Sequence, residues 1–247
     1  MSDSEILSYQ FSSNFRNNGS LSDAEYILNE DINNISGIKL RNFCCPLTIP
    51  LVDSRNNKLY LRETTSGSVV TVTLTTGNYI VNGTNSNSIL LQIEQALEAN
   101  SPNTWSYSLS YSEITNRITI SSTNGSFAFV DGIDNFYYEL GFNASNYGTF
   151  AGSQTGAEPI DCSGLKILHI VSNIRTSKVF SKNFSILGSI IIEEENLQVT
   201  SYDDQSSDYA VSDLKSMSSL RISFYDERFR KLTFNKDYYL TINFVVD

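Results

Sequence analysis

The stretch from Gly77 to Phe142 decides the fold class, and its centre reads Ser88-Ile89-Leu90-Leu91-Gln92-Ile93-Glu94-Gln95-Ala96-Leu97. Ile89, Ile93 and Leu97 recur every four residues, which places one apolar stripe along a helix of about three turns. Residues 85–88 are Asn or Ser, whose side chains can accept hydrogen bonds from the free N–H groups of a first helical turn. The pattern therefore predicts an amphipathic helix over 89–97.

After this helix the period changes to two, in Thr104-Trp105-Ser106-Tyr107-Ser108-Leu109-Ser110-Tyr111. Every odd position is large and apolar, and every even position carries a hydroxyl, which is typical of a half-buried strand. Thr115-Asn116 turns the chain, and Ile118 and Ile120 predict a partner strand. Phe127 and Phe129 predict a third. Residues 136–140 predict a short helix that ends at Gly141 in the left-handed conformation. The whole stretch reads as a small α+β module.

Length and composition indicate a globular protein. The chain has 247 residues, of which 40% are hydrophobic and 12% aromatic, enough for one large β domain or two smaller ones. No apolar run approaches the ~20 residues that span a bilayer. Met1 to Tyr9 lacks the basic and apolar regions of a signal peptide, so we expect synthesis in the cytosol. The net charge of −10 disfavours nucleic acid and anionic membranes as partners.

Residues 1–21 are polar, with few apolar positions, and two interpretations stay open. One is a frayed terminus. The other is an arm that orders only against a neighbouring subunit, with Phe11, Phe15 and Arg16 as subunit contacts.

Outside residues 52–162 the sequence predicts eight strands, the number in a jelly roll built of two Greek keys. They are Ala24–Leu28, Ile35–Phe43, Leu165–Val171, Lys178–Phe180, Ser185–Ile192, Leu197–Tyr202, Leu220–Tyr225 and Tyr238–Val246. The polar turn 29–34 joins the first two, and the Gly- and Ser-rich loop 143–163 marks the clearest boundary.

The predicted fold is thus mainly β: a single eight-stranded jelly roll with an inserted small α+β domain. Residues 1–21 form the arm, 22–51 and 163–247 the jelly roll, and 52–162 the insert. A tandem of two domains divided near Ser163 would give nearly the same strands.

The residues that could carry catalysis do not form a recognisable site. His169 is the one histidine, and its place in the apolar run 165–171 indicates a hydrogen-bonded core residue. No Gly-x-Ser-x-Gly or phosphate-binding glycine loop occurs. The acidic loop 203–213 could line a calcium site but lacks the EF-hand spacing. Cys44 and Cys45 are adjacent and Cys162 is alone, so free thiols are expected. We therefore expect no enzymatic activity, no cofactor and no metal.

Several of these elements, taken together, resemble the penton (vertex) proteins of virophages, Polinton-like viruses and related giant viruses, whose major capsid proteins are double jelly rolls. The resemblance rests on Gly77-Asn78-Tyr79, the helix 89–97, the strand pair 105–111 and 117–121, and Tyr137-Tyr138-Glu139-Leu140-Gly141-Phe142. It implies a jelly roll in the capsid shell and an outward insert. It also implies a homopentamer at each five-fold vertex, in contact with the major capsid protein, in virions assembled from protein made in the host cytoplasm.

Two other functions stay open at this point. One is a trimeric viral spike or receptor-binding protein with the α+β module as its head. The other is a carbohydrate-binding β-sandwich, which would present Trp105, Tyr107 and Tyr111 as an exposed aromatic strip, unless that face packs on the helix 89–97.

Overall fold

The computed structural model describes residues 4–81, 87–176, 179–181, 184–193 and 198–247. The chain is mainly β and divides into two compact units. Unit 1 combines Met1–Ile49 with Leu165–Asp247, and unit 2 is Pro50–Gly164. The sequence predicts the insert at 52–162, and the division in the structure lies two residues outside each of these bounds.

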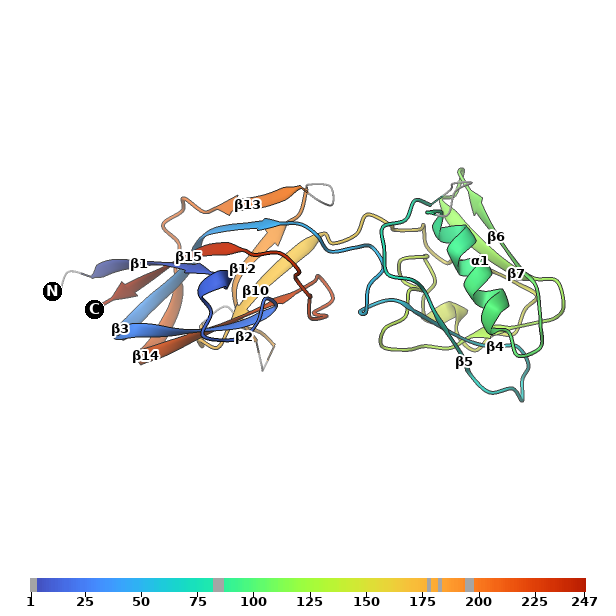
Figure 1. Cartoon of the computed structure of the whole chain (residues 1–247), viewed down its shortest axis with the longest axis horizontal. Helices are drawn as coiled ribbons and strands as arrows, with labels where there is room; N and C mark the ends of the chain where they lie inside the picture. The colour runs from blue at the N-terminus through green and yellow to red at the C-terminus, as the bar shows by residue number, and fades with distance from the viewer. Residues whose placement is uncertain (1–3, 82–86, 177–178, 182–183, 194–197) are drawn as a thin grey trace. The chain divides into compact units, whose positions relative to one another are not determined.

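Unit 1 is one nine-stranded antiparallel sheet that folds back on itself, in a jelly-roll-like arrangement (Figure 1). Its elements are β1 (Glu5–Ser12), the 3-10 helix η1 (Ser13–Phe15), β2 (Asn18–Ser20), β3 (Asp23–Pro46), β10 (Ile167–Ser172), β11 (Val179–Ser181), β12 (Phe184–Ile191), β13 (Val199–Asp203), β14 (Ala210–Tyr225) and β15 (Tyr239–Val246). The strand order is β1-β15-β3-β14-β10-β12-β11, and both β2 and β13 pair with β3. This list differs from the eight strands that the sequence predicts.

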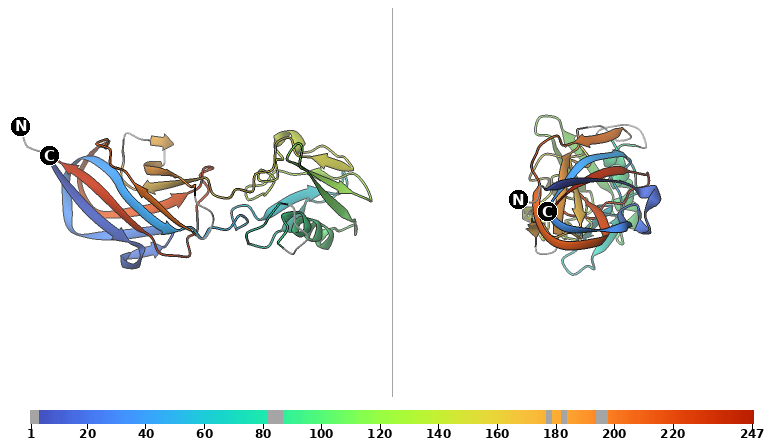
Figure 2. Two further views of the ribbon diagram at one scale, coloured as in Figure 1. Left: turned by 90° about the horizontal axis from the view of Figure 1, so that it is seen from above. Right: turned by 90° about the vertical axis from the view of Figure 1, so that its left-hand side faces the viewer.

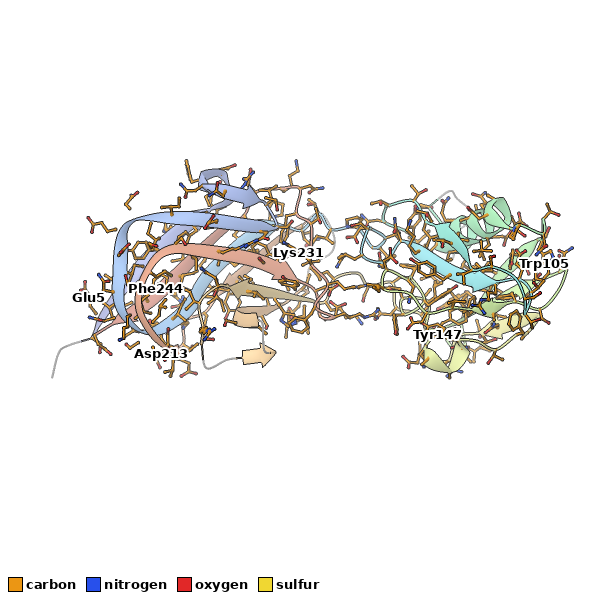
Figure 3. The ribbon with its side chains drawn as sticks, turned by 90° about the horizontal axis from the view of Figure 1, so that it is seen from below. Glu5, Trp105, Tyr147, Asp213, Lys231 and Phe244 are labelled. Atoms are coloured by element: carbon orange, nitrogen blue, oxygen red, sulfur yellow. The ribbon has the colours of Figure 1, made fainter. Side chains whose placement is uncertain are left out.

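The largest difference is β3, which is one strand of 24 residues where the sequence predicts two strands and a turn at 29–34. Residues 23–38 pair with β14, and residues 35–44 pair with β15. Asn34 has a φ of 53°, a left-handed conformation that asparagine tolerates better than most residues. The chain bends there without leaving the sheet, as Figure 2 shows near the chain termini. Asp213, labelled in Figure 3, lies where the pairing of β14 with β3 shifts register.

Residues 5–20 also differ from the expected arm, because β1 and β2 within them belong to the sheet of unit 1. β1 pairs with β15 without interruption from Glu5↔Val246 to Ser12↔Tyr239. Leu7, Tyr9 and Phe11 alternate along β1 and pack against the core. Burial of these three side chains compensates for the ordering of the strand, which explains why a polar-looking segment is held in place.

The core of unit 1 is rich in aromatic side chains. Phe244 is fully buried inside the unit, whereas Glu5 lies at its surface (Figure 3). The rings of Phe224 and Tyr238 pack edge to face at 4.7 Å, a favoured arrangement for aromatic pairs. The Tyr26 hydroxyl donates to the Tyr238 hydroxyl at 3.0 Å, which satisfies two polar groups in this core. Burial raises the pKa of Tyr238, so both hydroxyls stay neutral.

In its described residues, 50–81 and 87–164, unit 2 holds two three-stranded sheets and one α-helix. Its elements are β4 (Lys58–Arg62), β5 (Val70–Thr73), α1 (Ile89–Asn100), β6 (Tyr107–Ser112), β7 (Arg117–Ser122), β8 (Ala128–Phe129), η2 (Ala144–Asn146) and β9 (Ser153–Thr155). The sheet orders are β5-β4-β8 and β6-β7-β9. The predicted helix is confirmed, and its stripe of Ile89, Ile93 and Leu97 is buried.

Two details of unit 2 differ from the expectation. The predicted third strand is present as β8, which pairs with β4. Residues 136–140 form turns and no helix. Gly141 nevertheless has the expected positive φ, of 80°, and a side chain there would lie 2.1 Å from the carbonyl oxygen of Glu158. The predicted boundary loop 143–163 contains η2 and β9 and belongs entirely to unit 2.

The aromatic residues on β6 and just before it do not form an exposed strip. Tyr107 is buried, and Trp105 and Tyr111 are half-buried against the same core as α1. The ring of Trp105 packs so close to Gly125 that a Cβ there would lie 2.7 Å from it. The helix therefore covers the face that a sugar-binding strip would need.

No helix within the described residues has the length and apolar character to cross a membrane.

Candidate subunit interface

The outer edge of β1 is open. Ser13 N donates to Tyr238 O at 3.1 Å, which fixes the pairing pattern of the β1–β15 ladder. In an antiparallel pair, alternate residues turn their N–H and C=O groups toward the partner. The odd residues of β1 therefore bond to β15, and Ile6, Ser8, Gln10 and Ser12 direct theirs away from it. These outward groups have no backbone partner among the described residues.

Among the residues that the structure describes, this edge also lacks the features that usually block an edge strand, which are lysine, proline, a bulge or a covering element. β1 reads Glu-Ile-Leu-Ser-Tyr-Gln-Phe-Ser, and its pairing with β15 has no register shift over eight residues. Its one charged residue, Glu5, is at the far end of the strand. An unblocked edge of this length is a template for pairing with another chain.

The turn after β1 projects an aromatic side chain into solvent. Ser13 is fully buried, where its hydroxyl donates to Asp237 Oδ1 at 2.8 Å and accepts from Tyr238 N at 3.1 Å. Arg16 Nη1 donates back to Ser13 O at 2.6 Å. These contacts hold η1 in place, and Phe15 at its end is 81% exposed.

A groove of about 1040 Å³ begins at this edge. It is lined by residues of β1 and β15, by the turn that carries Phe15, by both halves of β3 and by Asp203 of β13. Three of the lining side chains are apolar and more than half exposed: Phe15 at 81%, Ile27 at 56% and Tyr239 at 55%. Their exposure side by side along one groove is typical of a surface that binds another protein.

The groove carries an ion pair at the end that β13 lines. Arg41 Nη1 lies 3.0 Å from Asp203 Oδ1, and both side chains are partly exposed. An exposed pair of this kind stabilises the fold by less than about 1 kcal/mol. Its value for a protein contact is that it offers a donor and an acceptor at a fixed position.

The structure separates the three residues that the sequence predicts as subunit contacts. Phe11 is 7% exposed and packs in the core of its own chain, so its side chain is not available to a neighbour. Arg16 directs its guanidinium at the backbone of its own turn, through Ser13 O and Gly19 O. Phe15 alone combines exposure with a place in the groove, and its role as a subunit contact stays a prediction.

Sequence reasoning missed Ile27 and Tyr239 as candidate contacts. Both alternate with buried residues, Tyr26 and Leu240, so each occupies the outward position of a strand. The alternation was visible in the sequence. The pairing of β1 with β15 that brings these positions to one groove joins residues more than 200 positions apart, and local patterns do not contain it.

The acidic loop after β13 is organised around a lysine. The ammonium group of Lys39 lies 3.1 Å from Asp204 Oδ1, donates to the hydroxyl of Ser206 at 3.1 Å and also donates to its carbonyl oxygen. Lys39 is 5% exposed. The Asp204 carboxylate is thus paired with a side-chain cation. Across the described ranges, no three His, Cys, Asp or Glu side chains group as metal ligands.

Two opposing effects set the pKa of Asp204. Partial burial raises it, and the hydrogen bonds from Ser206 together with the Lys39 ammonium lower it, with a net result of about 2. Asp204 is therefore ionised throughout the physiological range and holds the loop to β3.

His169 differs from the expected core residue, since it is only partly buried on β10. Its Nδ1 lies 2.8 Å from Ser189 Oγ, and its ring stacks on Phe229 at 4.6 Å. Burial lowers its pKa, against the opposing effect of the Asp226 and Glu227 carboxylates. The expected hydrogen bond is present, on the outward face of the strand.

No protein-family model and no curated protein matches this chain. Among solved structures, the mavirus penton protein is similar at 11% sequence identity and a TM-score of 0.45, over 98% of this chain and 100% of that one. The D2–D3 domains of the flagellar cap protein FliD from Escherichia coli align at 11% identity and a TM-score of 0.19, over 95% of this chain and 98% of that one.

Proposed function

We propose that this chain is a structural protein of a viral capsid, a penton, five copies of which close each five-fold vertex of an icosahedral shell. Its partners are four further copies of itself and the major capsid protein of the same virion. The proposal assigns it no enzymatic activity and no cofactor.

The observation that carries the proposal is the open edge of β1 beside the groove with Phe15, Ile27 and Tyr239. A protein that works alone normally covers or charges such an edge, because an open one promotes uncontrolled association. A protein that works inside an assembly buries it against a neighbour. The resemblance of the sequence to penton proteins supports the capsid as that assembly.

The electrostatics support a place in the shell away from the genome. The net charge is −10, and binding to nucleic acid draws most of its affinity from Lys and Arg contacts with phosphates. An acidic shell protein avoids such contacts. A ring of five copies requires head-to-tail contacts, in which two different faces of each copy meet.

The test is the absolute mass of the purified full chain, measured by light scattering after size exclusion at several concentrations and salt levels. The proposal predicts a mass of five times 27.6 kDa. A trimer would favour the spike alternative, and a monomer at every concentration would contradict the homopentamer.

A pair of exposed-side-chain variants sharpens this test. Phe15→Ala removes the most exposed aromatic of the groove and is expected to weaken association by roughly 2 kcal/mol for each contact. Ile133→Ala removes a side chain that is 99% exposed in unit 2, and the pentamer should persist. If the two variants weakened the pentamer to the same extent, a role for the groove would be contradicted.

A further inference from the structure

A four-stranded layer within unit 1 has two open edges. Residues 42–44 of β3 pair with β15 on one side and with β13 on the other, and β15 in turn pairs with β1. The local order is β1-β15-β3-β13, so β1 and β13 bound the layer. The two edges face in opposite directions along it, which is the arrangement that a head-to-tail contact requires.

The outer edge of β13 can be derived in the same way as that of β1. Leu47 N donates to Gln198 O at 2.7 Å, and Asp204 N donates to Arg41 O at 2.9 Å. The even residues of β13 therefore bond to β3, and Val199, Ser201 and Asp203 direct their backbone groups away from it. Those groups have no backbone partner in the part of the chain that the structure describes. Val199 is 55% exposed.

The two edges lie at the same level of the layer. Ser12 is opposite Tyr239, Tyr239 is opposite Cys44, and Cys44 is opposite Ser201. One row across the layer thus starts at the open edge of β1 and ends at the open edge of β13. Copies related by rotation about an axis along the strands would bring these two ends together without a shift.

The strand directions also fit. β15 and β13 are both antiparallel to β3, and β1 is antiparallel to β15. β1 and β13 consequently run in opposite directions, so their pairing between rotated copies is antiparallel, which is the more stable ladder.

We propose that β13 of one copy pairs with the open edge of β1 in the next copy and so extends the sheet from subunit to subunit around the ring. The occupant of the β1 edge is therefore a second copy of this chain. The backbone groups of Gln10 and Ser12 bond to those of Asp203 and Ser201 in the neighbour, and Val199 of the neighbour meets the groove that Phe15 and Tyr239 line. This inference rests on the proposed homopentamer and names the surfaces that form it.

Cysteine cross-linking tests the contact on the full chain. Gln10 and Ser201 are exposed and lie on the same face of the layer. Within one copy, two intervening strands separate their positions by about 14 Å, so a bis-maleimide with a span of about half that distance cannot join them. Gln10→Cys combined with Ser201→Cys should yield covalent species from dimer to pentamer. The chain without the added cysteines controls for Cys44, Cys45 and Cys162.

The two single-cysteine variants, Gln10→Cys and Ser201→Cys, are the controls that can contradict the proposal. Each should stay uncross-linked in a head-to-tail ring. Covalent dimers from Gln10→Cys alone would show two β1 edges paired across a two-fold axis and would overturn the proposal. A pentamer whose double variant does not cross-link would also overturn it and leave the proposed function standing. Absence of any pentamer would refute the proposed function itself.

A matched pair of charge variants gives a second readout. Gln10→Lys puts a charge on the edge, and Gln95→Lys puts the same charge on the exposed face of α1 in unit 2. Gln10→Lys should raise the concentration at which the pentamer is half dissociated by at least about tenfold, which corresponds to about 1.4 kcal/mol. Gln95→Lys should leave that concentration within about twofold. Equal effects would contradict the contact. Thermal unfolding of both variants confirms that they fold.

Discussion

The two units treat the edges of their sheets differently. In unit 2, Leu109 N donates to Glu94 Oε2 and Tyr107 N donates to Glu98 Oε1, both at 3.3 Å. Two helix carboxylates thus occupy the edge of β6 that pairs with no strand. In unit 1 the corresponding edge of β1 meets no such group among the described residues. Unit 2 satisfies its edge internally, and unit 1 leaves one for another chain.

This difference indicates which of the two units can associate with another chain. Both units have a closed aromatic core, with Phe129 at 1% and Phe244 at 0% exposure, so neither needs a partner for its apolar interior. The backbone edges differ, and an unpaired edge determines which surface can accept a strand. Association should therefore depend on unit 1.

The largest expected effect comes from truncation of the two cores. Phe129→Ala and Phe244→Ala should each lower the free energy of unfolding by about 3–5 kcal/mol, because each leaves a cavity that the neighbours fill only in part. Phe244 is on β15, which carries β1, so only its variant should also weaken the pentamer. Chemical unfolding and light scattering measure the two effects. Equal loss of the pentamer in both variants would contradict the conclusion that association depends on unit 1.

Buried polar groups give the next effect. Glu63 is 2% exposed, accepts from the Tyr107 hydroxyl at 2.9 Å and accepts from Asn103 Nδ2 at 2.8 Å. Glu63→Ala leaves the buried Tyr107 hydroxyl without its acceptor and also removes the bond from Asn103, which together should cost about 2–3 kcal/mol. In unit 1, Tyr238→Phe removes one neutral hydrogen bond and should cost about 1 kcal/mol. The order of the two losses, measured by denaturant unfolding, checks this reasoning, and a larger loss for Tyr238→Phe contradicts it.

Removal of the two carboxylates at the edge of β6 should leave unit 2 with an open strand edge, as in unit 1. Glu94→Ala with Glu98→Ala removes the two acceptors, at a cost of about 1 kcal/mol for each hydrogen bond, and should produce association beyond the pentamer at high concentration. Glu94→Gln with Glu98→Gln keeps a carbonyl oxygen at each position and is the control. Light scattering distinguishes them. No difference between the two double variants would show that the carboxylates do not protect the edge.

The smallest effect is a change in acid stability. The pKa of Asp204 is lowered from an ordinary 3.8 to about 2 in the folded chain. A lowered pKa contributes stability above the unfolded value, and this contribution disappears as the pH falls from near 4 to about 2. Asp204→Asn should therefore lose stability at neutral pH and little at pH 2. Unfolding free energies at several pH values test this, and a difference that does not change with pH contradicts it.

Local periodicity predicted the elements that bury one face by themselves. The four-residue spacing from Ile89 to Leu97 predicted α1, and the alternations in 105–111 and 238–246 predicted β6 and β15. These patterns suffice because the apolar residues at each spacing are the ones that one face of the element buries.

Elements held by pairing with distant segments were missed. β9 has the sequence Ser153-Gln154-Thr155 and contains no apolar residue. It is a strand because it pairs with β7, where hydroxyl pairs such as Thr119–Thr155, at 2.9 Å, bridge the two strands. Residues 29–34 are polar and look like a turn, yet they continue β3, because Ile32 and Asn33 pair with β14. The candidate interface is of the same kind, since it depends on the pairing of β1 with β15.

The central claim is that the outer edge of β1 is paired in the assembly and free in the single chain. Residue-resolved amide hydrogen exchange on the pentamer and on the dissociated chain tests it most directly. The odd amides, such as those of Leu7 and Tyr9, should be protected in both states because they bond to β15. The amides of Gln10 and Ser12 should be protected only in the pentamer. Equal, fast exchange of Gln10 and Ser12 in both states would contradict the account.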